Sequence, residues 1–599
     1  MCGVYLRICR NPDCKVEHHD LETLNRISHR GPDGVQLIKN NITRAIGFTR
    51  LAIRALDSGN QPYIFLSYVS VINGELYNQS EISALLETTP VPVGDMQILG
   101  QYLSECGIDA IANADGMFAG LLIDDDNRQL HIFRDKVGEK PLFYRLTDNH
   151  LEVLSENIFK NETTPDRVNN TKRAVLGFLP NGTEYVNNVK RVAPGTYITF
   201  DLETFISKEI RYWEWPNRPR SGVNRTKAEQ KTFKEILYSS VESRLAADVP
   251  VASLLSGGID SAVITKIAQD ILGYPVTAYT LAFKNSKYDE SNNARISAKA
   301  IGCELRVIEI DSEDISRIIP SCINSMQEPI LDSACLSLYS LCAEVSKDFK
   351  VALTGDGGDE LFQGYSLFEN LKVLSFSRKL PKISRLITQI LLNFQRNPSK
   401  RSYISNYMKF ERINSILKHQ DLNPIILALS PLGGTNLLDD VIDSLDPEFR
   451  TYLNFAANNT SANYLENFYR VEILPHLYLE KADRMSMVHG LELRAPLLAP
   501  QLIECANRIS QSELTKSERK VFLRQFAAEF LPPEVITAKK HGFSPPLSEI
   551  VKYLEEPNWN LEYLGLSQES LQQNWQLALK GNENASYAAW AALVLNYYS

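Results

Sequence analysis

The order of apolar and polar stretches along the chain predicts two parts with different architectures. From residue 227 onward, short runs rich in apolar residues alternate with helical patterns. The runs at 249–255, 277–283, 304–310 and 350–353 have the length and composition of strands in a parallel sheet. We therefore predict an α/β domain in the second part of the chain.

The first 200 residues follow a different pattern, in which strand-like stretches alternate with turns and short helices. The run at 68–72 is apolar, and the stretch at 49–53 is strand-like with one arginine. A turn-rich loop at 29–34 precedes them. This pattern favours a layered α+β architecture. The polar stretch around 201–225 predicts a connection between the two parts.

The composition narrows the class of protein. A chain of 599 residues is too long for one core. The net charge of −9 argues against a nucleic-acid partner. Nine cysteines without a C-x-x-C pair favour a reducing compartment over a disulfide framework or a zinc site. Since the start has no signal-peptide layout and no apolar run reaches the ~18 residues of a membrane helix, we expect a cytoplasmic enzyme without a membrane partner.

The segment 256–261, Ser-Gly-Gly-Ile-Asp-Ser, follows an apolar run and precedes a helical pattern. Its glycines let backbone N–H groups approach oxygen atoms, and a helix start favours anions. A carboxylate at Asp260 beside a phosphate would need a cation between the two negative groups. Asp260 is therefore predicted to be a magnesium ligand. The segment is not a Walker loop. A plain strand–turn–helix junction is the alternative. The hexapeptide resembles the pyrophosphate loop of the ATP-pyrophosphatase superfamily.

A second glycine-rich loop, 354–360, follows the run at 350–353. Its carboxylates are expected to face the same crevice as Asp260, because parallel strands end at one edge of the sheet. Asp359 and Asp260 would then share a magnesium ion with the phosphates. A turn with acidic helix caps is the alternative. Backbone near Leu281, in the neighbouring strand, is expected to meet the adenine.

Cys2 is the second landmark. Removal of Met1 would leave a thiol and an α-amine on one residue, and an amine that titrates near pH ~8 can activate the thiol. A small buried residue at the start of a strand is the alternative. Further motifs follow in order at 29–34, 49–53, 73–78, 94–95, 115–119 and 134–144. Together they resemble the class II glutamine amidotransferase domain, which has a layered αββα N-terminal-nucleophile fold.

This resemblance assigns roles by position. Cys2 would attack the side-chain amide of glutamine, while the Asn73 side chain and the Gly74 backbone would form the oxyanion hole. The remaining residues of this site would bind the substrate.

The glutamine-binding residues implied by the resemblance are Arg50, Leu51, Ile53, Glu75 and Asp95. Arg50 would hold the α-carboxylate, a task suited to guanidinium. Glu75 and Asp95 would pair with the α-ammonium group.

The second part resembles the synthetase domain of asparagine synthetases. Besides the two loops, the matching segments are 328–329, 481–487, 491–497, Lys520 and 540–546. The resemblance implies domains at 1–205 and 206–599, the second a doubly wound parallel sheet with a helical C-terminal part. Its implied ATP contacts are Ser256, Gly257, Gly258, Asp260, Ser261, Leu281, Thr354 and Gly355, and its implied Mg²⁺ ligands are Asp260 and Asp359.

The implied reaction is a glutamine-dependent amidation. ATP would adenylate the β-carboxylate of aspartate, and ammonia from Cys2 would cross a tunnel to the acyl-adenylate. Lys520 would neutralise charge and Asp356 would accept an ammonia proton, although some members have glutamate where this chain has Asp356. The acceptor stays open: another carboxylate, such as a uronic-acid sugar or a natural-product precursor, is the second hypothesis, and a scaffold on an inactive enzyme fold is the third. A homodimer is a candidate assembly.

The stretch 372–401 carries eight Lys and Arg residues interleaved with apolar ones. A solvated helical face on an insertion is the simpler interpretation, and a basic amphipathic contact surface is the alternative.

Overall fold

A computed structural model gives the structure of the chain. It describes residues 2–10, 17–40, 43–158, 167–185, 188–217, 227–284, 289–365, 367–368, 411–413, 415–416, 418–419, 421–455, 461–508, 520–538 and 543–599. The basic stretch 372–401 and the start of the predicted segment 540–546 lie outside these residues.

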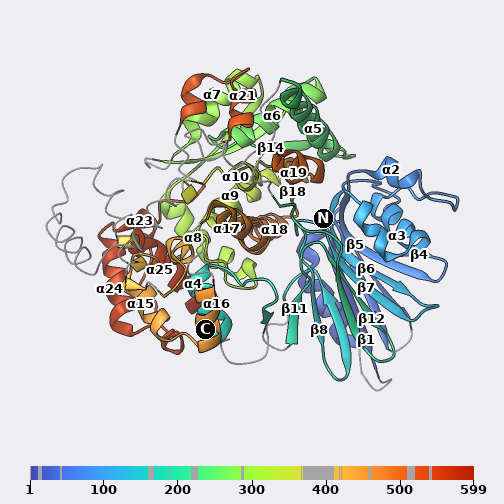
Figure 1. The fold of residues 1–599 in the computed structure, drawn as a ribbon, viewed down its shortest axis with the longest axis horizontal. Helices are drawn as coiled ribbons and strands as arrows, with labels where there is room; N and C mark the ends of the chain where they lie inside the picture. Colours follow the sequence, from blue (N-terminus) through green and yellow to red (C-terminus); the bar gives the residue numbers. More distant parts are fainter. Residues whose placement is uncertain are drawn as a thin grey trace.

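The first part of the chain is built from two antiparallel sheets packed face to face (Figure 1). The first sheet has the order β10-β11-β8-β9-β1-β3-β2 and the second β13-β12-β7-β6-β5-β4. Their strands are β1 (Gly3–Cys9), β2 (Gly34–Asn40), β3 (Arg44–Arg50), β4 (Tyr63–Phe65), β5 (Tyr68–Leu76), β6 (Gly116–Asp124), β7 (Gln129–Arg134), β8 (Phe143–Leu146), β9 (His150–Leu154), β10 (Glu184–Tyr185), β11 (Val189–Arg191), β12 (Thr196–Asp201) and β13 (Ser207–Arg211). The second sheet therefore continues past residue 205.

Alternation along β1 explains the layers. Val4 and Leu6 pack into the core between the two sheets, whereas Tyr5 and Cys9 pack on the opposite face with Leu24 of α1 (Glu17–Arg26). Successive strand residues point to opposite faces, so an apolar strand of this kind is covered on both sides. The outer face of the second sheet is covered by α3 (Asp95–Cys106), beside α2 (Gln79–Ser83). The predicted αββα layering is confirmed.

The second part contains a five-stranded parallel sheet in the order β16-β15-β14-β17-β18. Its strands are β14 (Val251–Leu254), β15 (Thr277–Phe283), β16 (Glu304–Ile310), β17 (Val351–Leu353) and β18 (Glu492–Arg494). The four predicted strands are confirmed, and the edge strand β18 was not among them. The order reverses between β14 and β17, and such a switch point is where doubly wound sheets bind ligands.

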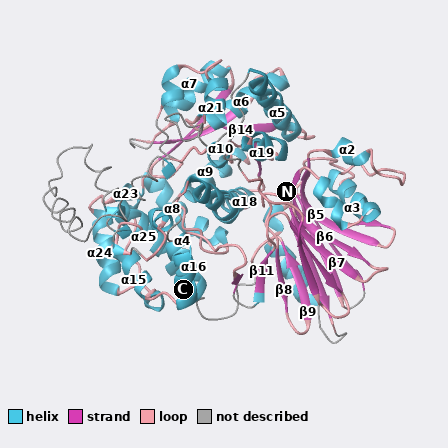
Figure 2. Ribbon diagram, viewed as in Figure 1, coloured by secondary structure: helices cyan, strands magenta, loops and turns pink. Residues whose placement is uncertain are grey.

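Helices cover both faces of this sheet (Figure 2). The helices from the linker to the second loop are α5 (Lys227–Leu245), α6 (Ile259–Leu272), α7 (Ser291–Ile301), α8 (Ser312–Met326), α9 (Ala334–Val345) and α10 (Gly358–Phe362). Val263 and Ile267 of α6 pack on one face, and Leu341 and Val345 of α9 on the other. The doubly wound architecture is confirmed.

The remainder of the second part is helical. Its helices are α14 (Pro424–Leu429), α15 (Asn436–Asp443), α16 (Pro447–Phe455), α17 (Ala462–Asn467), η4 (Phe468–Tyr478), α18 (Leu479–Met487), η5 (Pro496–Leu498), α19 (Pro500–Asn507), α21 (Val521–Ala527), α22 (Pro533–Thr537), α23 (Leu547–Ile550), η6 (Val551–Tyr553), η7 (Glu562–Leu564), α24 (Gln568–Leu579) and α25 (Glu583–Tyr597). Three further helices lie in the first part: η1 (Ser28–Arg30), η2 (Ile108–Asn113) and α4 (Arg167–Leu176).

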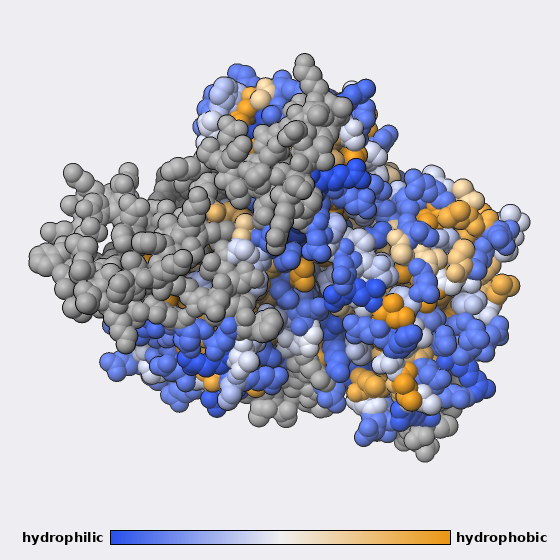
Figure 3. Space-filling model, viewed as in Figure 1, coloured by the Kyte–Doolittle hydropathy of each residue, from blue (hydrophilic) through white to orange (hydrophobic). Residues whose placement is uncertain are grey.

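Hydrophilic residues dominate the face shown in Figure 3, with apolar ones in small groups. Across the described residues, no helix is both long and apolar enough to cross a membrane.

Candidate active sites

The structure gathers most of the residues predicted to bind and hydrolyse glutamine around one small cavity of about 30 Å³. Those on its wall are Cys2, Arg50, Leu51, Ile53, Gly74, Glu75 and Asp95. They come from β1, β3 and the loop after it, β5, and the start of α3. Sequence segments far apart in the chain thus meet as the resemblance predicts, while their roles stay predictions.

Cys2 and Asn73 face each other at the end of β1. The backbone N–H of Cys2 donates to Oδ1 of Asn73 over 2.7 Å. The donor end of the amide, Nδ2, is buried without a hydrogen-bond partner among the described residues. An unpaired buried donor beside a thiol is what an oxyanion hole requires. Burial raises the pKa of the Cys2 thiol, and the backbone N–H of Leu51 partly offsets this rise.

Gly74 has a backbone conformation that a residue with a side chain cannot adopt at this position. Its φ is +147°, and a Cβ atom here would lie 2.0 Å from the carbonyl oxygen of Met117. The close approach of β5 to β6 therefore requires glycine. It also fixes the position of the neighbouring Asn73 amide.

Two carboxylates of the pocket lie around an arginine that sequence reasoning missed. Arg54 Nη1 lies 3.7 Å from Glu75 Oε2 and 3.5 Å from Asp95 Oδ2. Its place directly after the predicted segment 49–53 was the available signal. Asp95 also accepts the backbone N–H of Leu76 over 2.9 Å. Arg54 thus occupies the space between the two groups predicted to bind an ammonium ion.

The segment that carries Arg50 is held by both parts of the chain. The guanidinium of Arg50 donates to the carbonyl oxygens of Ala55 and Leu56. Asp248, beyond the linker, accepts the backbone N–H of Ala55 over 2.7 Å, and its own N–H donates to Ile53. The second part of the chain therefore shapes this wall of the pocket.

The Ser256–Ser261 loop joins β14 to α6 at the switch point of the parallel sheet. Ser256 and Ser261 contact each other through their hydroxyl groups over 2.9 Å. The Ser256 hydroxyl accepts the N–H of Gly258 over 3.2 Å. Hydroxyls and backbone donors therefore gather at one turn before a 14-residue helix, which suits phosphate oxygens.

The two predicted loops touch. A Cβ atom at Gly355 would lie 2.7 Å from the Ser261 nitrogen, and one at Gly358 would lie 2.8 Å from Asp260 Oδ1. Only glycine permits this approach without a shift of the backbone. The two loops, which the sheet topology was expected to bring to one edge, thus lie in contact.

Lys520 lies between the two carboxylates predicted to hold magnesium. Its Nζ contacts Asp260 and lies 2.6 Å from Asp359 Oδ1. Lys520 precedes α21 with a φ of +56° and is buried. Asp260 Oδ1 is buried without a hydrogen-bond partner among the described residues. Two carboxylates with an oxygen to spare fit a Mg²⁺ ion that also binds phosphates.

Asp356 faces away from this trio. It is exposed and accepts a hydrogen bond from the Thr354 hydroxyl over 2.9 Å. Together with Glu139 and Asp483 it lines a cavity of about 20 Å³ between the two parts of the chain. The structure thus places Asp356 on the side of the loop that faces the first domain.

Leu281, whose backbone was expected to meet the adenine, is buried in β15 among core residues.

Arg30 lies between the two candidate sites and was missed as a functional residue, although its motif was noted. Its Nε donates to the carbonyl oxygen of Cys2 over 3.3 Å. Its Nη1 donates to Glu156 and to Asp483, each over 2.8 Å. Because Asp483 also lines the cavity beside Asp356, this arginine links the two sites.

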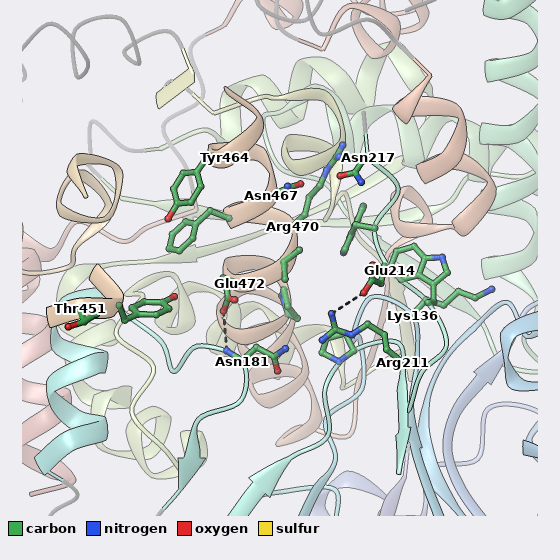
Figure 4. Close-up of a pocket in the computed structure, with 17 residues that line it drawn as sticks. Lys136, Asn181, Arg211, Glu214, Asn217, Thr451, Tyr464, Asn467, Arg470 and Glu472 are labelled. Atoms are coloured by element: carbon green, nitrogen blue, oxygen red, sulfur yellow. Dashed lines mark hydrogen bonds and ion pairs between the residues drawn. The ribbon is translucent and has the colours of Figure 1, made fainter. Parts of the chain in front are cut away.

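A larger cavity of about 640 Å³ lies at the linker, between β13 and η4 (Figure 4). None of the predicted site residues lines it. Two contacts are made within its lining: Arg211 pairs with Glu214, and Glu472 accepts the N–H of Asn181. Size alone therefore does not mark the active site of this protein.

Comparison with known proteins gives the same division of the chain. The family model described as asparagine synthase matches residues 232–597, and the one described as glutamine amidotransferase domain matches residues 1–213. Asparagine synthetase [glutamine-hydrolyzing] 1 of Bacillus subtilis is 28% identical over 584 residues, covering 92% of this chain and 88% of the relative. Asparagine synthetase [glutamine-hydrolyzing] 3 of the same organism is 25% identical, covering 91% and 87%.

A relative with a different name matches over a similar length. Amidase chry2 of Gibberella zeae is 27% identical over 608 residues, covering 91% of this chain and 89% of the relative. The family matches span both parts of the molecule. The chain belongs to the asparagine synthase family and carries a glutamine amidotransferase domain at its N-terminus.

Proposed function

We propose that this enzyme converts L-aspartate to L-asparagine, with glutamine as the nitrogen donor and ATP as the activating substrate. Family membership supports glutamine-dependent amidation by a carbon–nitrogen ligase. The observation that carries the proposal is the arrangement of two sites in one chain. A thiol faces an unpaired amide donor at Cys2, and Lys520 lies beside Asp260 at the switch point of a parallel sheet.

The first half-reaction would take place at Cys2. After removal of Met1, the nitrogen that now donates to Asn73 would be the α-amine, which takes the thiol proton. The thiolate attacks the amide carbon of glutamine, and Asn73 Nδ2 and the Gly74 N–H donate to the developing oxyanion. Ammonia leaves, and water then releases glutamate from the thioester.

The second half-reaction would take place between the two glycine loops. Ser256, Ser261 and the start of α6 would bind the pyrophosphate oxygens of ATP. Asp260 and Asp359 would hold Mg²⁺, which would neutralise charge between these carboxylates and the phosphates. Lys520 would stabilise the negative charge that develops as the carboxylate of the acceptor attacks the α-phosphorus.

Ammonia would travel from Cys2 toward Asp356. The contacts of Arg30 with the Cys2 carbonyl and with Asp483 support this route. The cavity beside Asp356 lies at its far end. There Asp356 would accept a proton as ammonia attacks the acyl-adenylate.

A second candidate differs only in the acceptor. Relatives that include Amidase chry2 are about as similar to this chain as the asparagine synthetases are. This supports amidation of another carboxylate as the alternative. A cytoplasmic location and a homodimer complete the proposal, and light scattering tests the assembly.

An ATP–pyrophosphate exchange assay over a panel of carboxylates tests the acceptor. Exchange that depends on L-aspartate is expected, and exchange with another acceptor alone would favour the second candidate. A Cys2→Ala variant tests the nitrogen donor: it should lose the use of glutamine and keep the use of ammonium chloride. Continued use of glutamine would contradict the role of Cys2.

A further inference from the structure

A group from the other end of the chain lies behind the wall of the glutamine pocket. Arg494 belongs to β18, the edge strand of the parallel sheet, yet its Nη2 lies 3.2 Å from Glu75 Oε1 in the N-terminal part. Its side chain is completely buried. The roles expected for Glu75 do not include this arginine.

Three contacts fix the guanidinium from its own domain. Its Nε donates to Glu492 Oε1 over 2.7 Å, and its Nη1 donates to the carbonyl oxygens of Arg244 and Ala246 over 2.9 and 2.8 Å. A guanidinium has five N–H donors in a rigid plane. With Nε and Nη1 engaged, Nη2 is held beside Glu75 as an ion-pair contact without a hydrogen bond among the described residues.

The charges around Glu75 show what Arg494 does there. Glu75 lies near a second carboxylate, Asp95, and the Arg494 guanidinium also forms an ion pair with Glu492. Arg54 is the other cation beside Glu75 and Asp95. Burial and Asp95 raise the pKa of the Glu75 carboxyl group, and Arg494 and Arg54 oppose that rise. Lys140 is a further cation that acts on Glu492. Loss of Arg494 would therefore favour the protonated form of Glu75 further.

We propose that Arg494 is a positioning residue for the glutamine site, which favours the ionised form of the Glu75 carboxylate and holds it in the pocket wall so that it binds the α-ammonium group of glutamine. This inference rests on the proposed function, because it concerns the substrate of Cys2. It assigns to the synthetase domain a direct part in glutamine binding.

The test measures glutamate release from glutamine by the full chain, which needs no acceptor carboxylate. Arg494→Gln is expected to raise KM for glutamine at least tenfold while kcat changes less than threefold. The rise of kcat/KM with pH should also shift to higher pH, because Glu75, left beside Asp95, Glu492 and Arg54 alone, ionises later. Arg494→Lys keeps the charge and should recover part of the affinity.

The matched control is Arg173→Gln. Arg173 is also a buried arginine paired with a glutamate, its Nη2 lying 2.7 Å from Glu328 Oε2, but it does not line the glutamine pocket. It should leave KM for glutamine and the pH profile unchanged. If Arg494→Gln does not fold, Arg494→Lys carries the test, with a KM above that of the wild type and an unchanged kcat.

Two outcomes would overturn the inference. Normal glutamine hydrolysis by the wild type, with KM unchanged in both Arg494 variants, would overturn it and leave the proposed function intact. A wild-type protein that releases no glutamate would overturn both.

Discussion

The Nζ atom of Lys520 lies 2.6 Å from Oδ1 of Asp359, and the same ammonium group contacts Asp260. One cation therefore joins the two glycine loops of the parallel sheet. Buried carboxylates that face one another need such a charge between them. The same two carboxylates are those proposed to hold Mg²⁺ beside the phosphates of a bound nucleotide.

Lys520→Met should reduce pyrophosphate release by a factor of ~10²–10³, because it removes a positive charge from the site of developing negative charge. Glutamate release at Cys2 should stay within threefold of the wild type. The two products are measured separately in one reaction. Pyrophosphate release within tenfold of the wild type would show that Lys520 has no part in activation.

Asn73→Ala should lower kcat for glutamate release by ~10²-fold or more, since it removes one donor of the oxyanion hole. KM for glutamine should change little. Asn78→Ala is the matched control, because this amide bonds to Asn113 and Asp115 outside the pocket. Equal effects of the two substitutions would contradict the assignment of Asn73.

Gly355→Ala should raise KM for ATP strongly, because its Cβ atom would lie 2.7 Å from the Ser261 nitrogen and would force the two loops apart. Gly34→Ala in β2 serves as the control, since a Cβ atom there meets no atom within 4 Å. Both variants are compared in ATP–pyrophosphate exchange. An unchanged KM in Gly355→Ala would show that the contact of the loops is dispensable.

Glu360 should make the stability of the fold depend on pH. Burial and the neighbouring Asp359 raise the pKa of Glu360 to about 7, above the ordinary value of 4.5. Between these values the unfolded chain loses the proton first, so stability falls as pH rises, by up to about 1.4 kcal/mol per pH unit. Glu360→Gln should flatten this slope in denaturant titrations from pH 5 to 8. The same slope in wild type and variant would contradict this origin.

Arg54→Met should raise KM for glutamine, because Arg54 is the other cation beside Glu75 and Asp95 and its loss favours the protonated form of Glu75. The wild type and the variant are compared in the glutamate-release assay. A lower KM in the variant would instead show that Arg54 competes with the α-ammonium group for these carboxylates.

Local patterns in the sequence predict the fold well. The apolar runs of β14 to β17 and the alternation in β1 each specify a strand, and the order of the motifs indicates which loops meet. The three-residue strand β18 was missed because Glu492-Leu493-Arg494 is short and has one apolar position between two charged ones. Its place in the sheet comes from long-range pairing with β17.

The candidate sites are less predictable at the boundary between the domains. Cys2 and Ser256 stand in local sequence motifs that indicate their chemical roles. No local motif indicates what Arg30, Arg54 and Arg494 contact, because an arginine that neutralises a buried carboxylate has no sequence pattern of its own. Only the three-dimensional partners, such as Glu75 for Arg494, reveal what each one does.

The strand that carries Arg494 is synthesised long after Glu75 and Cys2 have left the ribosome. The pocket wall around Ile53 is likewise completed by Asp248, which is translated later and forms backbone contacts with Ile53 and Ala55. A nascent chain therefore holds an amidotransferase domain whose pocket is unfinished until the synthetase sheet closes. On this order of assembly, the proposed glutamine site reaches its full affinity only after the C-terminal sheet has formed.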